Sequence, residues 1–185
     1  MDTSVAPDER LMGLAAGGSR DAMNVLLRRY ATPLLTFIQR MIGDAHRAEE
    51  LFQEVFLVVW KRRLDYQYPR PFRSWLLGIA ANHCRAELRR RLPLPMVVDD
   101  DWEPVRATSE PTPVEAAIAS EQATLVAQAV ADLPPGQRTV LVMRIWNGLS
   151  YAEIAEAVGR TEATVRSHMF HGLAAVRKYL EPRLH

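Results

Sequence analysis

Residues 148–171 read GLSYAEIAEAVGRTEATVRSHMFH, and this stretch decides which fold the chain adopts. Ser150 and Glu153 have the spacing of a capping box, which predicts the start of a short helix. Gly159 predicts the end of that helix, and Thr161 can cap a second, longer one. Two helices joined by a short turn that contains glycine are typical of a helix-turn-helix motif.

The second helix of such a motif places its N-terminal part in the major groove of DNA. Val165 and Met169 are expected to pack against the first helix, which leaves a polar face outside. Arginine can bond guanine edges or phosphates, and serine and threonine can serve either. The alternative is a small helical hairpin that touches no DNA. The candidate DNA-contact residues are Arg160, Thr161, Glu162, Thr164, Arg166, Ser167, Phe170 and His171.

The rest of the chain is also predicted to be helical. Capping residues, prolines and glycines outline its helices, and no segment shows the sustained alternation of a strand. We therefore predict an all-α fold of two small helical domains. The expected helices span residues 19–30, 44–63, 72–91, 113–132 and 137–146. After residue 30, a helix is expected to restart at Pro33 and to stop near Gly43.

The net charge of +1 hides an uneven distribution along the chain. Residues 1–95 carry 15 basic and 10 acidic side chains, residues 96–121 carry 1 and 7, and residues 122–185 carry 7 and 5. The acidic middle is rich in proline, and both properties favour an extended linker. It is either a plain solvated tether or a negatively charged strand placed in a basic channel. We expect domains at 1–95 and 113–185, joined by a linker at 96–112.

Several classes of protein are disfavoured by what the sequence lacks. Cys84 is the one cysteine, which excludes an internal disulfide framework and is interpreted as a buried helical thiol. No apolar run is long enough for a membrane span and the N-terminus lacks a signal-peptide core, so we expect a cytoplasmic protein without membrane insertion. His168 and His171 have no third ligand nearby, so no metal or other cofactor is expected. An enzyme, such as a recombinase with a helix-turn-helix tail, would need catalytic residues, and no phosphate loop, nucleophile elbow or metal cluster is found.

Four stretches, in order, resemble bacterial RNA polymerase sigma factors of the sigma-70 family. Residues 131–144 and 148–167 resemble the two halves of region 4. Residues 48–57 resemble the polymerase-docking helix of region 2, and residues 72–90 resemble its promoter-melting part. The order and spacing are similar to those of the small extracytoplasmic-function class, which has regions 2 and 4 without the larger domain between them.

The resemblance implies a sigma factor that recruits polymerase to promoters and is not an enzyme. Region 2 would bind the clamp helices of core RNA polymerase, formed by its beta and beta-prime subunits, and open the minus-ten element by capturing a flipped base of the melted non-template strand. Region 4 would read the minus-35 element as duplex DNA. The implied polymerase contacts are Glu49, Glu50, Gln53, Glu54, Phe56 and Leu57.

For the minus-ten DNA, the resemblance implies Phe72, Arg73, Ser74, Trp75, Asn82, Arg85, Arg89 and Arg90. Unstacking a base costs a few kcal/mol, which stacking and a snug pocket must offset. For Trp75 alone, a place in the core is the better interpretation. In the linker, Asp99, Asp100 and Asp101 would act as an RNA-like polyanion in the polymerase channel.

The sequence departs from the family pattern at several positions. Glu50 replaces the common aspartate of the docking motif, and Ala81 and Ala86 stand where arginine and aspartate are usual. His168 and His171 occupy positions that often carry arginine, and neutral histidine has no fixed charge for a phosphate.

Two further expectations concern partners. The resemblance implies an anti-sigma partner, because many members of the class are held inactive by one. The chain shows no sensory segment of its own, so we expect its regulation to come from another protein. A plain DNA-binding regulator that never joins polymerase would account for the C-terminal motif but would leave the docking and melting motifs unexplained.

Overall fold

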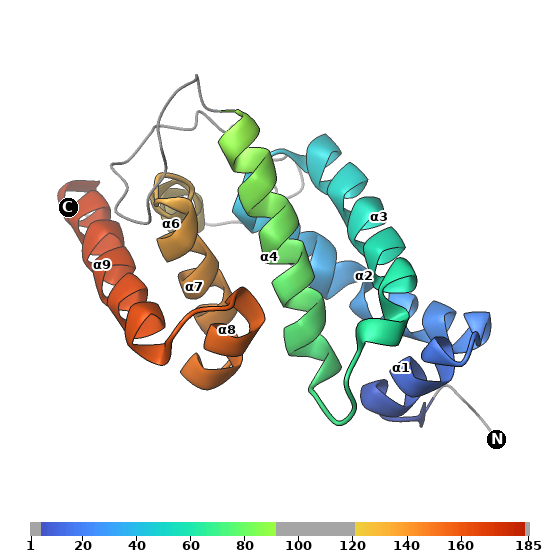
Figure 1. The fold of residues 1–185 in the computed structure, drawn as a ribbon. Helices are drawn as coiled ribbons and strands as arrows, with labels where there is room; N and C mark the ends of the chain where they lie inside the picture. Colours follow the sequence, from blue (N-terminus) through green and yellow to red (C-terminus); the bar gives the residue numbers. More distant parts are fainter. Residues whose placement is uncertain (1–4, 92–120, 184–185) are drawn as a thin grey trace.

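A computed structural model describes residues 5–91 and 121–183, and the regular structure in both ranges is helical (Figure 1). The all-α prediction is therefore confirmed for these residues. The first range contains α1 (Asp8–Ala16), α2 (Arg20–Ile42), α3 (Ala45–Lys61), a 3-10 turn (Arg63–Asp65) and α4 (Phe72–Arg90). The second contains α6 (Glu121–Ala131), α7 (Pro135–Ile145), α8 (Tyr151–Val158), α9 (Glu162–Leu180) and a 3-10 turn (Glu181–Arg183).

Local capping explains where several of these helices begin and end. The Ser19 side chain accepts a hydrogen bond from the Ala22 amide at 3.2 Å, and Asp44 accepts one from the Arg47 amide at 3.0 Å. Gly43 has a φ of 71°, in the left-handed region that glycine adopts without strain, and ends α2. The helix starts predicted at Ser19 and Asp44 are confirmed, whereas the predicted start at Pro113 lies outside the described residues.

The predicted restart at Pro33 is wrong, because α2 runs without interruption from Arg20 to Ile42. A proline inside a helix removes one backbone hydrogen bond and costs about 3 kcal/mol. The side chains of Leu26, Leu34 and Phe37, on both sides of the proline, are buried. Each buried side chain of this size contributes about 1.5–3 kcal/mol, so tertiary packing offsets the local penalty.

The sequence interpretation also missed α1. Its Leu11, Met12 and Ala15 are fully buried, and the helix packs against α2. Asp8, at its start, accepts hydrogen bonds from Arg29 and from the Tyr30 hydroxyl of α2. The N-terminal segment therefore belongs to the first helical bundle.

The two helical halves lie against each other through α4, which stands in the middle of the molecule (Figure 1). Helix α4 packs against α2 and α3 of its own half and against α7 and α8 of the other half. Buried apolar side chains from both halves form one continuous cluster. Among the described helices, none combines the length and apolar character that a bilayer span requires.

Candidate nucleic-acid interface

The helix-turn-helix predicted from the sequence is confirmed in α8 and α9. The Ser150 amide donates to the Glu153 carboxylate at 2.8 Å, and the Glu153 amide donates to the Ser150 hydroxyl at 3.2 Å, so both halves of the capping box are present. The Ser150 amide and the Ser150 hydroxyl both donate to the Glu153 carboxylate, and these two hydrogen bonds are the main reason that the pKa of Glu153 lies below its usual value. Gly159, with a φ of 67°, ends α8, and the Thr161 hydroxyl caps α9.

The outer face of α9 presents most of the predicted DNA contacts to solvent. Ile154 of α8 and Val165 of α9 are fully buried between the two helices, which orients the opposite face outward. Arg166 is held there by Glu162, at 3.1 Å, and by the face of Tyr151, with its guanidinium carbon 4.5 Å from the ring centre. The exposed predicted residues are Arg160, Thr161, Glu162, Arg166, Ser167, Phe170 and His171, whereas Thr164 is half-buried.

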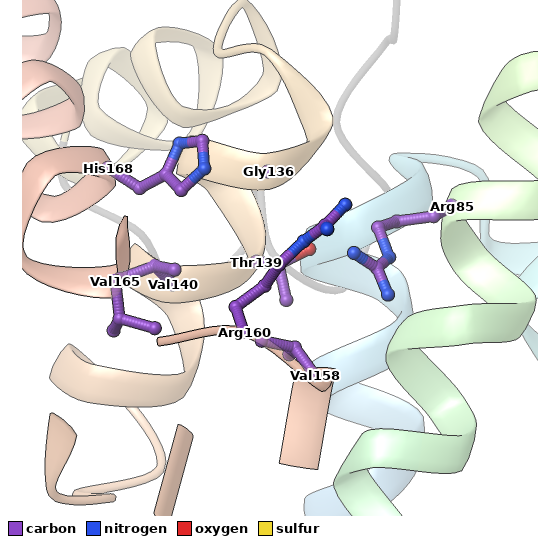
Figure 2. A pocket seen from close by; sticks show the side chains of 8 residues that line it. All are labelled: Arg85, Gly136, Thr139, Val140, Val158, Arg160, Val165 and His168. Carbon is purple, nitrogen blue, oxygen red and sulfur yellow. The ribbon is translucent and has the colours of Figure 1, made fainter. Parts of the chain in front are cut away.

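The two histidines of α9 have different environments. His171 is exposed, and its ring contacts the ring of Phe170 edge to face. His168 is half-buried and lies beside Gly136 of α7 (Figure 2), where an added Cβ atom on the glycine would stand 3.2 Å from the imidazole. His171 therefore faces the same side as the exposed predicted contacts, whereas His168 contributes to packing between α7 and α9.

The predicted polymerase contacts on α3 divide into three groups. Glu49, Gln53 and Leu57 are exposed and follow one another at four-residue spacing, so they form a stripe along the helix, with Leu57 59% exposed. Phe56 is 7% exposed and packs against Phe52 with the ring centres 5.2 Å apart. The remaining two, Glu50 and Glu54, are engaged in ion pairs.

The partner of those two carboxylates is Arg47, which sequence reasoning did not single out. Its guanidinium lies 2.7 Å from Glu50, 3.0 Å from Glu54 and 2.9 Å from Glu87 of α4. Arg91 adds a second cation 3.3 Å from Glu87. Hydrogen bonds from Arg47 are the main reason that the pKa of Glu87 lies below its usual value. These ion pairs connect α3 to the C-terminal end of α4. The sequence signal that could have identified them is the spacing of Glu50 and Glu54, three and seven residues after Arg47 on one helix.

The predicted minus-ten residues do not form one surface. Phe72, Ser74 and Trp75 are 0%, 1% and 6% exposed, and the two rings pack with Tyr66. The core interpretation of Trp75 is therefore confirmed. The other predicted minus-ten residues lie nearer the surface of α4: Arg73, Asn82, Arg89 and Arg90 are exposed, and Arg85, which donates a hydrogen bond to Asn82, is half-buried.

Two remaining predictions concern Cys84 and the acidic linker. Cys84 is fully buried, and burial raises the pKa of its thiol to about 12, so the interpretation as a buried helical thiol is confirmed. The linker residues Asp99, Asp100 and Asp101 lie outside the described residues.

Comparison with known proteins assigns both halves to families. Residues 26–92 match the family described as Sigma-70 region 2, and residues 123–176 match the family described as Sigma-70, region 4. The RNA polymerase sigma-H factor of Pseudomonas aeruginosa is 30% identical over 184 residues, which cover 96% of this chain and 95% of that protein. The ECF RNA polymerase sigma factor SigL of Mycobacterium tuberculosis is 31% identical over 168 residues, which cover 90% of this chain and 93% of that protein.

Two solved structures share the fold at lower identity. CnrH, in complex with the cytosolic domain of CnrY, superposes with a TM-score of 0.73 at 22% identity over 95% of this chain and 98% of its own. The sigma factor RpoE of Bartonella quintana, in complex with the anti-sigma factor NepR, superposes with a TM-score of 0.62 at 17% identity over 85% of this chain and 95% of its own. At these identities the similarity establishes the arrangement of helices.

Proposed function

This chain belongs to the extracytoplasmic-function class of the sigma-70 family, and on that premise we propose which of its residues bind polymerase and which contact promoter DNA during transcription initiation. The protein is a sigma factor and not an enzyme: it brings core RNA polymerase to specific promoters, and the polymerase performs the chemistry. The observation that carries the proposal is the order of the two matched regions along one chain, a docking helix followed by an exposed DNA-reading helix.

In this proposal, residues 1–95 are region 2 and bind core polymerase through α3. The exposed stripe of Glu49, Gln53 and Leu57 contacts the clamp formed by the beta and beta-prime subunits. Arg47 is a positioning residue. It pairs with Glu50 and Glu54 of α3 and with Glu87 of α4, and so fixes the rotation of α3 relative to α4.

The outer side of α4 contacts the minus-ten DNA. Arg89 and Arg90 are exposed at its C-terminal end, where cations also meet the favourable end of the helix dipole, and they bind phosphates. Asn82 and Arg85 stand one turn apart and contact the melted strand. Phe72 and Trp75 support the start of α4 from the core, since their rings are buried.

Residues 113–185 are region 4, and the exposed face of α9 enters the major groove at the minus-35 element. Arg166 is the principal base-reading candidate, because Glu162 and Tyr151 hold its guanidinium at a defined place on that face. The acidic linker, residues 96–112, passes through the polymerase channel.

We also propose control by an anti-sigma factor in the cytoplasm. The structures of CnrH and of the Bartonella quintana sigma factor RpoE contain the CnrY cytosolic domain and the anti-sigma factor NepR, respectively. A pull-down from native extract that yields polymerase but no inhibitor would argue against this part of the proposal.

Run-off transcription on a genomic promoter library, with core polymerase and the purified chain, tests the main proposal. We expect promoter-specific transcripts that need both components. Arg166→Ala should reduce them about tenfold, because a base-reading arginine contributes about 1–3 kcal/mol. Arg177→Ala is the matched control, since Arg177 lies on the same helix and also pairs with a glutamate four residues away.

The outcome that would overturn the proposal is DNA binding by a chain that neither co-purifies with core polymerase nor supports run-off transcription. Such a result would identify a plain DNA-binding regulator.

A further inference from the structure

We propose that Arg144 of α7 is a positioning residue for promoter recognition, which orients the base-reading guanidinium of Arg166 through the ring of Tyr151. The inference rests on the proposed function in one respect, the assignment of the exposed face of α9 to the minus-35 element. The three residues belong to α7, α8 and α9, so only the packing of these helices brings them together. Arg144 is not among the DNA contacts predicted from the sequence.

The ring of Tyr151 contacts two guanidinium groups. The guanidinium carbon of Arg166 lies 4.5 Å from the ring centre, and that of Arg144 lies 5.0 Å from it. Both distances are within the roughly 6 Å over which an aromatic face attracts a cation. Arg144 and Tyr151 are half-buried, whereas the side chain of Arg166 is 60% exposed. One ring therefore connects a half-buried arginine to the arginine on the outer face of α9.

Arg144 is held at a second point, on the turn that joins α7 to α8. Its guanidinium donates a hydrogen bond to the Leu149 carbonyl at 2.8 Å. Leu149 is 3% exposed, and its amide donates to the Met143 carbonyl at 3.2 Å, so the core holds this turn in place. The guanidinium of Arg144 thus connects a fixed turn to the ring of Tyr151.

The backbone of Tyr151 is fixed by the capping box of α8. The tyrosine is the first residue of the helix and directly follows its N-cap, Ser150. Ser150 and Glu153 bond each other in both directions around it. The freedom that remains to the tyrosine is rotation about its two side-chain bonds. Contact with Arg144 restricts that rotation and so fixes the plane of the ring.

Arg166 stays accessible to DNA while its guanidinium is held. Its hydrogen bond to the Glu162 carboxylate is 3.1 Å long. An arginine that reads the edge of a guanine must present two N–H donors in one plane. A single hydrogen bond to Glu162 leaves that plane free to turn, whereas contact with the face of Tyr151 restricts it. The orientation of the ring therefore decides how Arg166 meets a base.

Three roles of Arg144 predict different effects on transcription. A positioning residue changes the discrimination between base pairs, because it acts through Arg166. An arginine that binds a DNA phosphate weakens binding to all sequences about equally and contributes to its salt dependence. An arginine with a purely structural role changes the stability of the fold and leaves the discrimination unchanged.

The test measures run-off transcription by the holoenzyme, formed from core polymerase and the full chain, on a promoter recovered from the genomic library. The base pair that Arg166 reads is the minus-35 position whose substitution no longer affects the Arg166→Ala variant. We expect that substitution to lower wild-type transcription about tenfold, as a bidentate arginine contact discriminates to this extent. Arg144→Gln should reduce this ratio about threefold, because a cation–π contact at a partly exposed site is lost.

Variants of Tyr151 separate the ring from its hydroxyl. Tyr151→Leu should reduce the ratio about threefold, whereas Tyr151→Phe should retain it, because phenylalanine keeps the ring face. The ratio is taken within one variant, so a partial loss of folded protein cancels. Equal ratios for Tyr151→Leu and Tyr151→Phe overturn the proposal.

Arg183→Gln is the matched control for Arg144→Gln. Arg183 also donates to a main-chain carbonyl, that of Tyr179 at 2.7 Å, and its guanidinium carbon lies 3.9 Å from the centre of the Tyr179 ring. It belongs to the 3-10 turn that follows α9, at the opposite end of that helix from Arg166. Arg183→Gln should leave the ratio unchanged.

Combining Arg144→Gln with Arg166→Ala completes the test. The effect of a positioning residue disappears with the residue that it positions, so Arg144→Gln should not alter the discrimination that remains in the Arg166→Ala background. A wild-type ratio in Arg144→Gln overturns the proposal. A uniform loss of transcription from all promoter variants also overturns it and identifies a phosphate contact instead.

Failure of the proposed function has a different signature. A holoenzyme that makes no promoter-specific transcript from any member of the library counts against the proposed function. Specific transcripts whose ratio is unaffected by Arg144→Gln and by Tyr151→Leu count against the positioning role alone.

Discussion

Arg138 carries a buried charge that no sequence pattern marks as structural. Its guanidinium donates to the main-chain carbonyls of Ala131, Leu133 and Met41, and burial lowers its pKa to about 10, so it stays charged near neutral pH. Three carbonyl groups thereby gain a charged donor, and hydrogen bonds of this kind are worth about 1.5–3 kcal/mol each.

We expect Arg138→Ala to lower the free energy of unfolding by at least about 3 kcal/mol, because three carbonyl groups lose their donor and a cavity forms. Urea unfolding followed by circular dichroism measures the change. Arg177→Ala is the control and should stay within about 0.5 kcal/mol of the wild type, since its side chain is 81% exposed. Equal losses in the two variants would contradict the role assigned to Arg138.

Glu87 makes the stability of the first bundle sensitive to acid. Arg47 and Arg91 hold its pKa below the ordinary value of 4.5, so its ion pairs stabilise the fold above that pH and are lost as the pH falls through the lowered pKa. We expect Glu87→Gln to be less stable than the wild type at pH 7 and to lose less stability below pH 4.5. Urea unfolding at a series of pH values measures this difference. Glu49→Gln, on the exposed stripe of α3, is the control, and its pH profile of stability should match that of the wild type. Parallel pH profiles for Glu87→Gln and the wild type would refute the argument.

Helix α3 illustrates how one element divides between core and contact surface. Its apolar residues Leu51, Val55 and Val59 are buried, whereas Leu57 is 59% exposed beside Glu49 and Gln53. An exposed leucine within a polar stripe gains little from folding, so its contribution is expected in the complex with polymerase.

We expect Leu57→Ala to weaken binding to core polymerase about tenfold, which corresponds to the roughly 1.4 kcal/mol gained by burying most of such a side chain. Its thermal unfolding should match that of the wild type. Leu14→Ala, at an exposed leucine of α1, should leave polymerase affinity unchanged. Equal affinity of the Leu57→Ala variant and the wild type, measured by fluorescence anisotropy, would remove Leu57 from the docking surface.

The charge of the whole molecule is a balance between two positive halves and an acidic linker. The linker aspartates Asp99, Asp100 and Asp101 belong to the proposal that this segment occupies the polymerase channel as an RNA-like polyanion. Replacing all three with serine should alter abortive and initial transcription more than promoter binding. Abortive-product ratios and promoter affinity, measured on the same holoenzyme, provide the comparison, and equal losses in both would count against a role in the channel.

Several helix boundaries and the helix-turn-helix followed from local sequence, because their causes are local. Ser19, Ser150 and Thr161 cap helices through hydrogen bonds to amides three residues away, and Gly159 ends α8 because its φ of 67° is accessible to glycine. The same reasoning failed at Pro33, where burial of residues on both sides outweighs a local penalty.

Other features depend on which helices meet. Phe72 and Trp75 could have been surface or core residues, and their burial follows from contact with Tyr66 and Tyr30. Arg138 reaches a carbonyl 97 positions away, and Gly78 meets Ala157 only because α8 lies on α4. Residues three or four apart on a helix are neighbours in any fold, whereas contacts between helices arise from the packing of whole apolar faces. The local sequence therefore specified most of the helix ends and the helix-turn-helix motif, whereas tertiary packing decided the continuity of α2 and which of the motif residues remain available to a partner.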